Sequence, residues 1–327
     1  TITIKGKRIR FRGDWRNSGG NLRELFRGTF GGGHNVTMSG GFDFEGTPAA
    51  SMFNSTFRDC SNLTGSIPSG LFGNLSGAPA VNMFDYTFRD CPNLTGSIPS
   101  GLFGNLTGAP ASSMFRATFY NCGNLTGLIP GGLFGDISGA PATYMFSGTF
   151  SGCGNLTGLI PSGLFGNLTG APAFEMFYGT FRDCPNLTGS IPSGLFGNLT
   201  GAPATSMFND TFRGCSNLTG SIPSGLFGDI SGAPAGSMFA ATFYNCKNLT
   251  GSIPVGLFGD ISGAPAANMF NGTFINCSKL TGESALMPDG TTHLYEQFPT
   301  ASGTQCDDCY LGATGLSDYA TMPAAWK

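Results

Sequence analysis

The chain has 327 residues, of which 53 are glycine and only 11% are charged. Typical soluble proteins contain about 7% glycine and about 25% charged residues. Ser, Thr, Asn and Gly must therefore cover most of the surface. The net charge of −3 hides an asymmetry, since the basic residues concentrate near the N-terminus. No apolar run approaches the roughly 18 residues of a membrane span.

Residues 1–24 are predicted to form an N-terminal cap that contains a basic hairpin. Apolar and polar residues alternate in 1–4 and again in 9–12, and Gly6-Lys7 between them suits a two-residue turn. Half of the 16 basic residues fall in the first 27 positions. They could dock to an anionic glycan or membrane. We favour a charged cap, because charges on edge strands prevent end-to-end stacking.

Residues 25–289 repeat a single unit. The unit reads G-A-P-A-x-x-M-F-x-x-T-F-x-x-C-x-N-L-T-G-x-I-P-x-G-L-F-G-N/D-L/I-S/T, and eight regular copies follow one degenerate copy. A unit of this size cannot bury its apolar face alone, but it can when stacked against copies of itself. The period of 31 residues is set by eight cysteines: Cys60, Cys91, Cys122, Cys153, Cys184, Cys215, Cys246 and Cys277.

Each unit predicts one helix and one short strand. From Ala80 to Cys91 the inward residues are spaced three, one, three, one and three apart, which is one face of a helix of about three turns. The L-T-G-S-I-P string that follows is predicted to be a short strand ended by its proline. We therefore expect an α/β repeat solenoid, an elongated and curved leucine-rich-repeat-like stack of 31-residue coils with N- and C-terminal caps.

The strings C-x-N-L-T-G-S-I-P-x-G-L-F and M-F-x-x-T-F-x-x-C resemble the bacterial leucine-rich repeats of the BspA-like type. The resemblance covers about Leu25 to Met287, although this unit is longer by one or two helical turns. It implies a cell-surface or secreted protein that adheres to host or matrix components. It implies no catalytic residues.

Residues 290–327 depart from the repeat and are predicted to form a C-terminal cap in which Trp326 covers the last coil. They contain Cys306 and Cys309, which could be half a zinc site, a redox pair or a disulfide. A second C-x-x-C is absent from the sequence, so a structural disulfide is the favoured interpretation.

The eight repeat cysteines could be metal ligands, disulfide partners or buried thiols. One Cys per coil does not cluster ligands as metal sites require, and each Cys lies on the predicted apolar face. We expect buried, reduced thiols. The Asn of N-L-T is expected to form a ladder between coils, although the triplet also matches a glycosylation acceptor.

Function is predicted to reside in the outward residues of the M-F-x-x-T-F-x-x-C segment, because the copies differ mainly there. Tyr and Arg are enriched in this column, and these residue types are common at binding hot spots. Unconstrained drift between duplicated copies would also produce such variation. The candidate ligand-binding residues are Tyr86, Arg89, Tyr120, Tyr144, Phe174 and Tyr178.

The sequence therefore predicts a non-enzymatic, monomeric protein, extracellular or on the cell surface, which binds a host or matrix protein or glycan. We expect no cofactor, no metal site, no nucleic-acid partner and no membrane span. The alternative is a structural or surface-active solenoid, in which regular columns such as Thr56, Thr87 and Thr118 form an ice-binding-like lattice. The position of these threonines between inward phenylalanines argues against that alternative.

Overall fold

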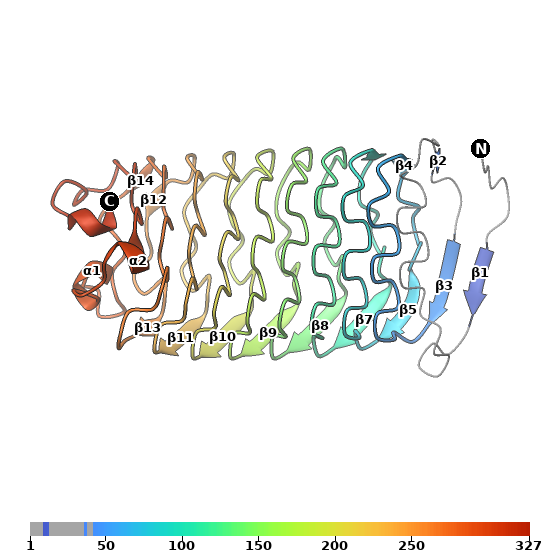
Figure 1. The fold of residues 1–327 in the computed structure, drawn as a ribbon, viewed down its shortest axis with the longest axis horizontal. Coiled ribbons are helices and arrows are strands. Elements are labelled where there is room, and N and C mark those ends of the chain that lie inside the picture. The colour runs from blue at the N-terminus through green and yellow to red at the C-terminus, as the bar shows by residue number, and fades with distance from the viewer. Residues whose placement is uncertain (1–8, 13–35, 38–41) are drawn as a thin grey trace.

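The computed structural model describes residues 9–12, 36–37 and 42–327. The chain winds into a long β-solenoid whose coils line up in a nearly straight row (Figure 1). The repeat solenoid expected from the 31-residue period is present, although its coils form a nearly straight row and not the curved stack that was expected. Within the described residues, no helix is both long enough and apolar enough to cross a membrane.

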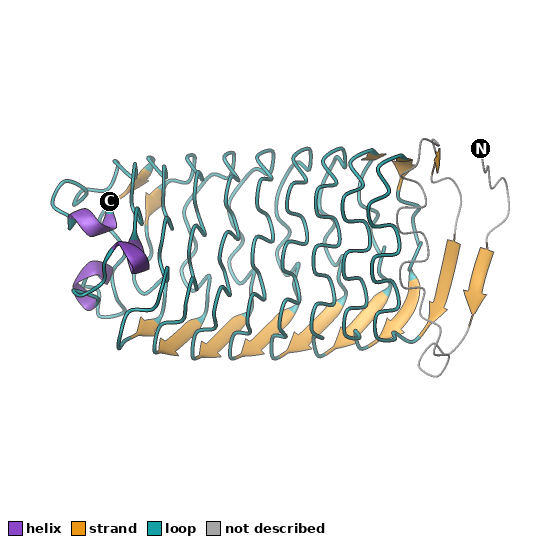
Figure 2. Ribbon diagram, viewed as in Figure 1, coloured by secondary structure: helices purple, strands orange, loops and turns teal. Residues whose placement is uncertain are grey.

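A nine-stranded parallel sheet runs along one side of the stack (Figure 2). Each G-N/D-L/I-S/T string forms one strand, whose central Leu or Ile is buried while the residues on either side are exposed. Register partners lie 29 residues apart, as in the pair Thr200 and Asp229. The strands are, in order, β1 (Ile9–Arg12), β3 (Phe42–Gly46), β5 (Asn74–Gly77), β7 (Asn105–Gly108), β8 (Asp136–Gly139), β9 (Asn167–Gly170), β10 (Asn198–Gly201), β11 (Asp229–Gly232) and β13 (Asp260–Ile261).

A second, narrower ladder is formed by the N-L-T-G strings on the opposite side (Figure 2). Its paired strands are β2 (Val36–Thr37), β4 (Leu63–Ser66) and β6 (Leu94–Thr95) at one end, and β12 (Gly251–Ser252) and β14 (Leu280–Thr281) at the other. Single parallel bridges, from Gly96 with Leu125 to Gly220 with Leu249, connect the coils between them. The predicted short strand is therefore present.

The predicted helix is absent, and the α/β assignment was wrong in this respect. Residues 80–91 and their equivalents, which we call the turn segments, form successive turns. Every fourth residue has a positive φ, as Asn82, Tyr86 and Asp90 show. Backbone N–H groups point alternately in two directions: Phe84 N–H donates to Met114 of the next coil at 2.8 Å, whereas Asp85 N–H donates back to Asn82 at 3.3 Å.

The spacing of the coils explains why no helix forms. Parallel strands lie about 4.7–4.9 Å apart, whereas an α-helix with its side chains is about 10–12 Å wide. Ladders on two opposite sides hold every coil at the strand spacing, so a helix does not fit on a third side of a straight stack. The turn segments instead use half of their amides to bond the adjacent coil, which satisfies the backbone at the narrower spacing.

The core consists of stacked copies of the same side chains. Phe88, Phe119, Phe150 and Phe181 are fully buried, as predicted, and adjacent rings of this column stack with centroids 5.7 Å apart. The equivalents of Phe84 and Phe103 form two further columns with the same periodicity. The inward pattern was therefore predicted correctly, although the backbone was not.

The C-terminal residues add one more coil to the stack, although their sequence does not match the repeat. Phe274 N–H donates to Cys309 O at 2.7 Å and Asn276 N–H donates to Leu311 O at 2.8 Å, the same bonds that join regular coils. Tyr310 stacks on Phe274 at 5.4 Å. Residues 305–318 are thus a last, degenerate coil, in which Cys309 occupies the Thr position and Tyr310 the Phe position.

Three short elements lie around this coil at the end of the stack: α1 (Leu294–Gln297) precedes it, α2 (Gly303–Cys306) leads into it, and η1 (Ala324–Trp326) follows it. Trp326 is only 2% exposed and lies over Phe270 and Tyr310, as predicted for a cap. Gln297 Nε2 donates to Ile261 O on the edge strand at 3.2 Å. At the other end, most of the predicted basic hairpin lies outside the described residues; Ile9–Arg12 pairs in parallel with β3.

Candidate binding surface

The turn face is the outward side of the turn segments. Between the buried Met-Phe, Thr-Phe and Cys of each coil, pairs of residues point away from the core. All five arginines beyond residue 27 lie here, together with five of the eight tyrosines. These are Arg58, Arg89, Arg116, Arg182 and Arg213, and Tyr86, Tyr120, Tyr144, Tyr178 and Tyr244.

The six predicted binding residues all lie on the turn face, on four successive coils. Phe174 is 38% exposed, while the other five side chains are half-buried. The sequence predicted their outward position from a helix. In the structure, the successive turns place the same residues outward. Tyr86 and Tyr144 occupy positive-φ positions, which place their rings over the neighbouring coil.

Tyr86 is the centre of a compact cation–π arrangement. The guanidinium carbons of Arg58, Arg89 and Arg116 lie 5.0, 5.1 and 4.6 Å from its ring centroid. These arginines come from three successive coils, so the 31-residue period brings them to one ring. Each such contact contributes about 0.5–1 kcal/mol at an exposed site, and together they fix the orientation of the ring.

The arrangement extends along the solenoid axis in two branches. Arg89 also lies 4.9 Å from the ring of Tyr120, and Arg116 lies 5.2 Å from the ring of Tyr144. Tyr144 then meets Phe174 edge-on, with ring centroids 5.1 Å apart. We call this set the Arg–Tyr cluster: Arg58, Tyr86, Arg89, Arg116, Tyr120, Tyr144 and Phe174.

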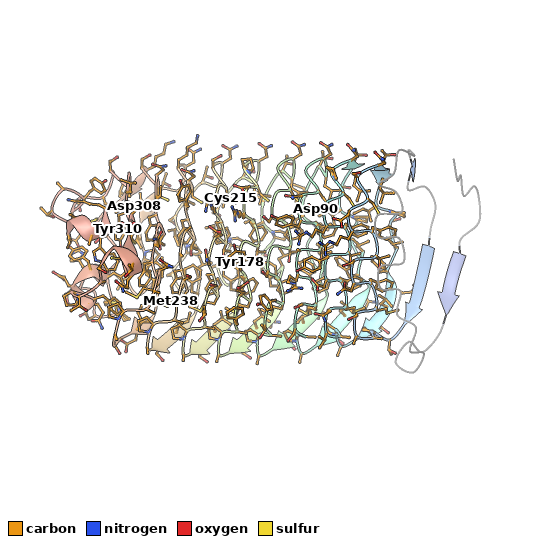
Figure 3. The ribbon with its side chains drawn as sticks, viewed as in Figure 1. Asp90, Tyr178, Cys215, Met238, Asp308 and Tyr310 are labelled. Carbon is orange, nitrogen blue, oxygen red and sulfur yellow. The ribbon has the colours of Figure 1, made fainter. Side chains whose placement is uncertain are left out.

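Tyr178 lies on the same coil as Phe174, near the middle of the stack (Figure 3). Within the described residues its ring is in neither the aromatic nor the cation–π contacts of the cluster. Burial raises the pKa of Tyr178, with a further contribution from the Asp210 carboxylate. Of the six predicted residues, five therefore belong to the Arg–Tyr cluster, in which Arg116 joins Tyr86 to Tyr144, and Tyr178 lies outside its contacts.

Two buried aspartates support this face, and the sequence interpretation missed both. Asp85 is 2% exposed. Arg116 bonds it through two nitrogens, Nε to Oδ1 at 3.0 Å and Nη2 to Oδ2 at 2.9 Å, and Asn54 donates to it at 3.3 Å. Burial raises the pKa of Asp85, while Arg116 opposes that effect. The signal was available, because residues 31 apart are neighbours in a stack with this period.

Asp210 likewise pairs with arginines of the turn face, farther along the stack. Its carboxylate lies 3.3 Å from Arg182 and 3.3 Å from Arg213. Arg213 in turn lies 4.6 Å from the ring of Tyr244. Desolvation raises the pKa of Asp210, and the two arginines lower it.

The arginines of the turn face are therefore neutralised by the protein itself. Each of the five has an aspartate carboxylate oxygen within 3.4 Å. Bidentate and multiply contacted guanidinium groups are held in one geometry. The face consequently presents pre-oriented aromatic and guanidinium groups but no excess positive charge for a strongly anionic ligand.

The threonine column considered for a surface lattice is inside the protein. Thr56, Thr87 and Thr118 are at most 1% exposed. The hydroxyl of Thr87 lies 3.0 Å from Phe53 O of the preceding coil and 2.9 Å from Phe84 O. A lattice built on these residues is thus excluded, because they join coils internally.

All eight repeat cysteines are free and buried, as expected. Cys122 Sγ lies 3.0 Å from Phe88 O of the preceding coil, and burial raises the pKa of Cys122 to about 12. Cys306 and Cys309 are also free and buried, so the expected disulfide is not formed. Among the described residues, no group of three or more His, Cys, Asp or Glu side chains is placed to hold a metal.

The asparagine ladder is confirmed where its bonds are seen. Asn93, Asn186 and Asn248 each donate through Nδ2 to a carbonyl of the preceding coil, at 2.7–2.8 Å. Lys279 replaces Asn in the last regular copy and donates to Asn248 Oδ1 at 2.7 Å. The conserved amide of N-L-T thus has a structural role.

Comparisons with known proteins leave the family open. No family model matches the chain, and no curated protein matches it. The solved structures to which it is similar include PEPR1–AtPEP1, at 15% identity and TM-score 0.14, and the plant peptide hormone receptor RGFR1 in complex with RGF2, at 17% identity and TM-score 0.08. They cover 77% and 76% of this chain, which spans 55% and 59% of theirs. Scores this low show no shared arrangement, so nothing about ligands is transferred.

Proposed function

We propose that this protein is a non-enzymatic recognition solenoid of the bacterial BspA-like surface type, which adheres to a host or matrix protein or glycan through the turn face. The observation that supports the proposal is the Arg–Tyr cluster. It gathers seven large side chains from five coils into one continuous set of contacts on the turn face.

The properties of the cluster favour an uncharged or weakly charged ligand that runs along the solenoid. Tyr gives a large contact area at a low cost in side-chain entropy. Arg normally loses more side-chain entropy on binding, but here the arginines are already held by aspartates. Because each coil adds another ring, weak contacts sum along the axis and produce avidity. The salt dependence should be mild, since each guanidinium group of the Arg–Tyr cluster is already paired with an aspartate.

Other features agree with this proposal. A chain with only 11% charged residues, whose surface must be covered largely by Ser, Thr, Asn and Gly, suits a secreted or cell-surface protein. Trp326 closes the C-terminal end of the stack, which opposes end-to-end association and fits a monomer. No cofactor or catalytic group is part of the proposal.

The test is a binding screen followed by one variant. The whole chain is screened on an array of glycans and matrix proteins, and the dissociation constant of any hit is measured. Tyr86, Arg89, Tyr120, Tyr144, Phe174 and Tyr178 are then replaced by Ser together. Other coils already hold Ser at positive-φ positions, as Ser55 and Ser113 show, so this backbone accepts it. Hot-spot loss predicts an affinity decrease of about 30-fold or more.

The matched control changes the same number of exposed residues on the nine-stranded sheet, which lies on another side of each coil. Asn105, Thr107, Asn167, Thr169, Asn198 and Thr200 are replaced by Ser, and affinity should stay within about twofold. Unchanged affinity in the turn-face variant, with its circular dichroism spectrum preserved, would remove this face as the site. The basic segment of residues 5–12 would then be tested next.

A further inference from the structure

A second threonine row, distinct from the buried one, lies on the narrow N-L-T-G ladder. Thr95 and its successors are exposed, and Thr64 at the start is half-buried. In the described part of the chain, none of the seven exposed hydroxyls has a hydrogen-bond partner within the protein. The Thr row consists of Thr64, Thr95, Thr126, Thr157, Thr188, Thr219, Thr250 and Thr281.

The backbone holds this row in strict register. Thr126 N–H donates to Gly96 O at 2.8 Å, and Thr157 N–H donates to Gly127 O at 2.9 Å. The same bond recurs up to Thr250 and Gly220, at 2.9 Å. Successive threonines therefore follow the strand spacing of about 4.7–4.9 Å. Because β-branched side chains are stiff about χ1, their hydroxyl and methyl groups point alike.

The row has not varied although its surroundings have. The position after each Cys is Ser, Pro, Gly or Lys, and the position after the Gly is Ser, Leu or Glu, with Leu128 and Leu159 61% and 62% exposed. Thr is present in all eight copies. The neighbouring Asn has a structural reason to persist, since it bonds the preceding coil. An exposed Thr whose hydroxyl makes no hydrogen bond within the protein has no such structural reason, because Ser or Val could form the same strand.

We infer that the Thr row is a second binding surface, which recognises the regular surface of ice. A row of small rigid groups gains little from a flexible ligand, which must be ordered on binding. A crystal face is already ordered, and its repeat along a row of water molecules is close to the strand spacing. Threonine hydroxyls both donate to and accept from water, and many equivalent weak contacts add up on a rigid lattice.

The nine-stranded sheet is the natural contrast. Its outward positions mix Ser with Thr and include the exposed carboxylates of Asp136, Asp229 and Asp260. Charged side chains lie beside both surfaces, since Lys247, Lys279 and Glu283 flank the Thr row at its C-terminal end, but only the broad sheet mixes Ser into its outward Thr positions. The ice-binding surface is therefore assigned to the narrow ladder and not to the broad sheet.

The experiment measures inhibition of ice recrystallisation by the whole chain. The wild type should inhibit. The triple variant Thr126→Lys, Thr157→Lys and Thr188→Lys should require an about tenfold or higher concentration, because it breaks the row at its centre. The matched variant Thr107→Lys, Thr169→Lys and Thr200→Lys changes the broad sheet and should stay within about twofold. Circular dichroism and thermal melting check that both remain folded.

Three results would overturn the inference: no inhibition by the wild type, equal loss in both triple variants, or no loss in the Thr126, Thr157 and Thr188 variant. If the wild type bound crystalline cellulose and had no effect on ice, the ligand would be a polysaccharide surface, and the inference about ice would be wrong. A Thr→Val version of the first triple variant sharpens the test, since it removes the hydroxyls but keeps the shape; it should weaken inhibition. The turn face lies on another side of each coil, so binding there should be unaffected.

Discussion

The regular coils and the last coil, residues 305–318, differ in sequence and share a backbone. Regular coils place Phe, Thr and Phe inward, whereas the last coil has Cys306, Cys309 and Tyr310 at those positions. Both have positive φ at every fourth residue, as at Asp308 and Gly312, and both make the same bonds to the preceding coil. The backbone geometry thus depends on the spacing of inward and positive-φ positions more than on particular residues. The energy of stacking depends on which side chains occupy the inward positions.

The largest effect should come from the aromatic columns, which the last coil has only in part. Phe181 is fully buried between Phe150 and Phe212, with ring centroids 5.7 Å away on each side. Phe181→Ala should lower the free energy of unfolding by about 3–5 kcal/mol, measured by chemical denaturation. Phe174→Ala, an exposed control, should change it by about 0.5 kcal/mol or less. A loss below about 1 kcal/mol for Phe181→Ala would contradict the packing described here.

The buried threonine column should give the next effect. The Thr211 hydroxyl lies 2.9 Å from Phe177 O and 2.7 Å from Phe208 O, and so links two coils. Thr211→Val keeps the shape but removes the donor, which should cost about 1–2 kcal/mol. The exposed Thr219→Val, measured in the same way, is the control and should be nearly neutral. Equal values for the two would mean that the internal bond contributes nothing.

A substitution in the last coil should raise the stability, because it makes this coil more like a regular one. Cys309 takes the position of Thr, so Cys309→Thr should recreate a hydroxyl bond to the Phe270 carbonyl. We expect a gain of about 0.5–1.5 kcal/mol in the free energy of unfolding. A loss of stability would show that the last coil does not reproduce the regular geometry at this position.

The smallest change is expected from thiol chemistry. Burial raises the pKa of Cys122, Cys184 and Cys277 to about 12 and that of Cys306 to about 11. Raised values keep the thiols protonated and unreactive from pH 7 to 9. Native protein should therefore react negligibly with a maleimide over this range, as followed by mass spectrometry, while unfolded protein should label at all ten cysteines. Fast labelling of several repeat cysteines in the native state would contradict their burial.

The candidate surface could be predicted only in part. The variable, outward Tyr and Arg positions were evident from aligned copies within one chain. Their contacts were not, because a cation–π arrangement such as that of Arg116 with Tyr86 depends on the spacing between coils. The role of Asp85 was hidden for the same reason, although its distance of 31 residues from Arg116 was a usable signal.

The sequence by itself determined the solenoid, the period and which side chains face inward, because a repeated unit with one apolar face has to stack. The sequence also contains a pattern that argues against a helix. Gly, Asn, Asp and Ser recur at every fourth position of the turn segments, as at Asn121, Gly148 and Gly152, and these residues adopt a positive φ more readily than others. Only the tertiary structure decided between helix and turns. The inward spacing of three and one fits both, and the choice depends on the distance between coils, which the two flanking ladders impose.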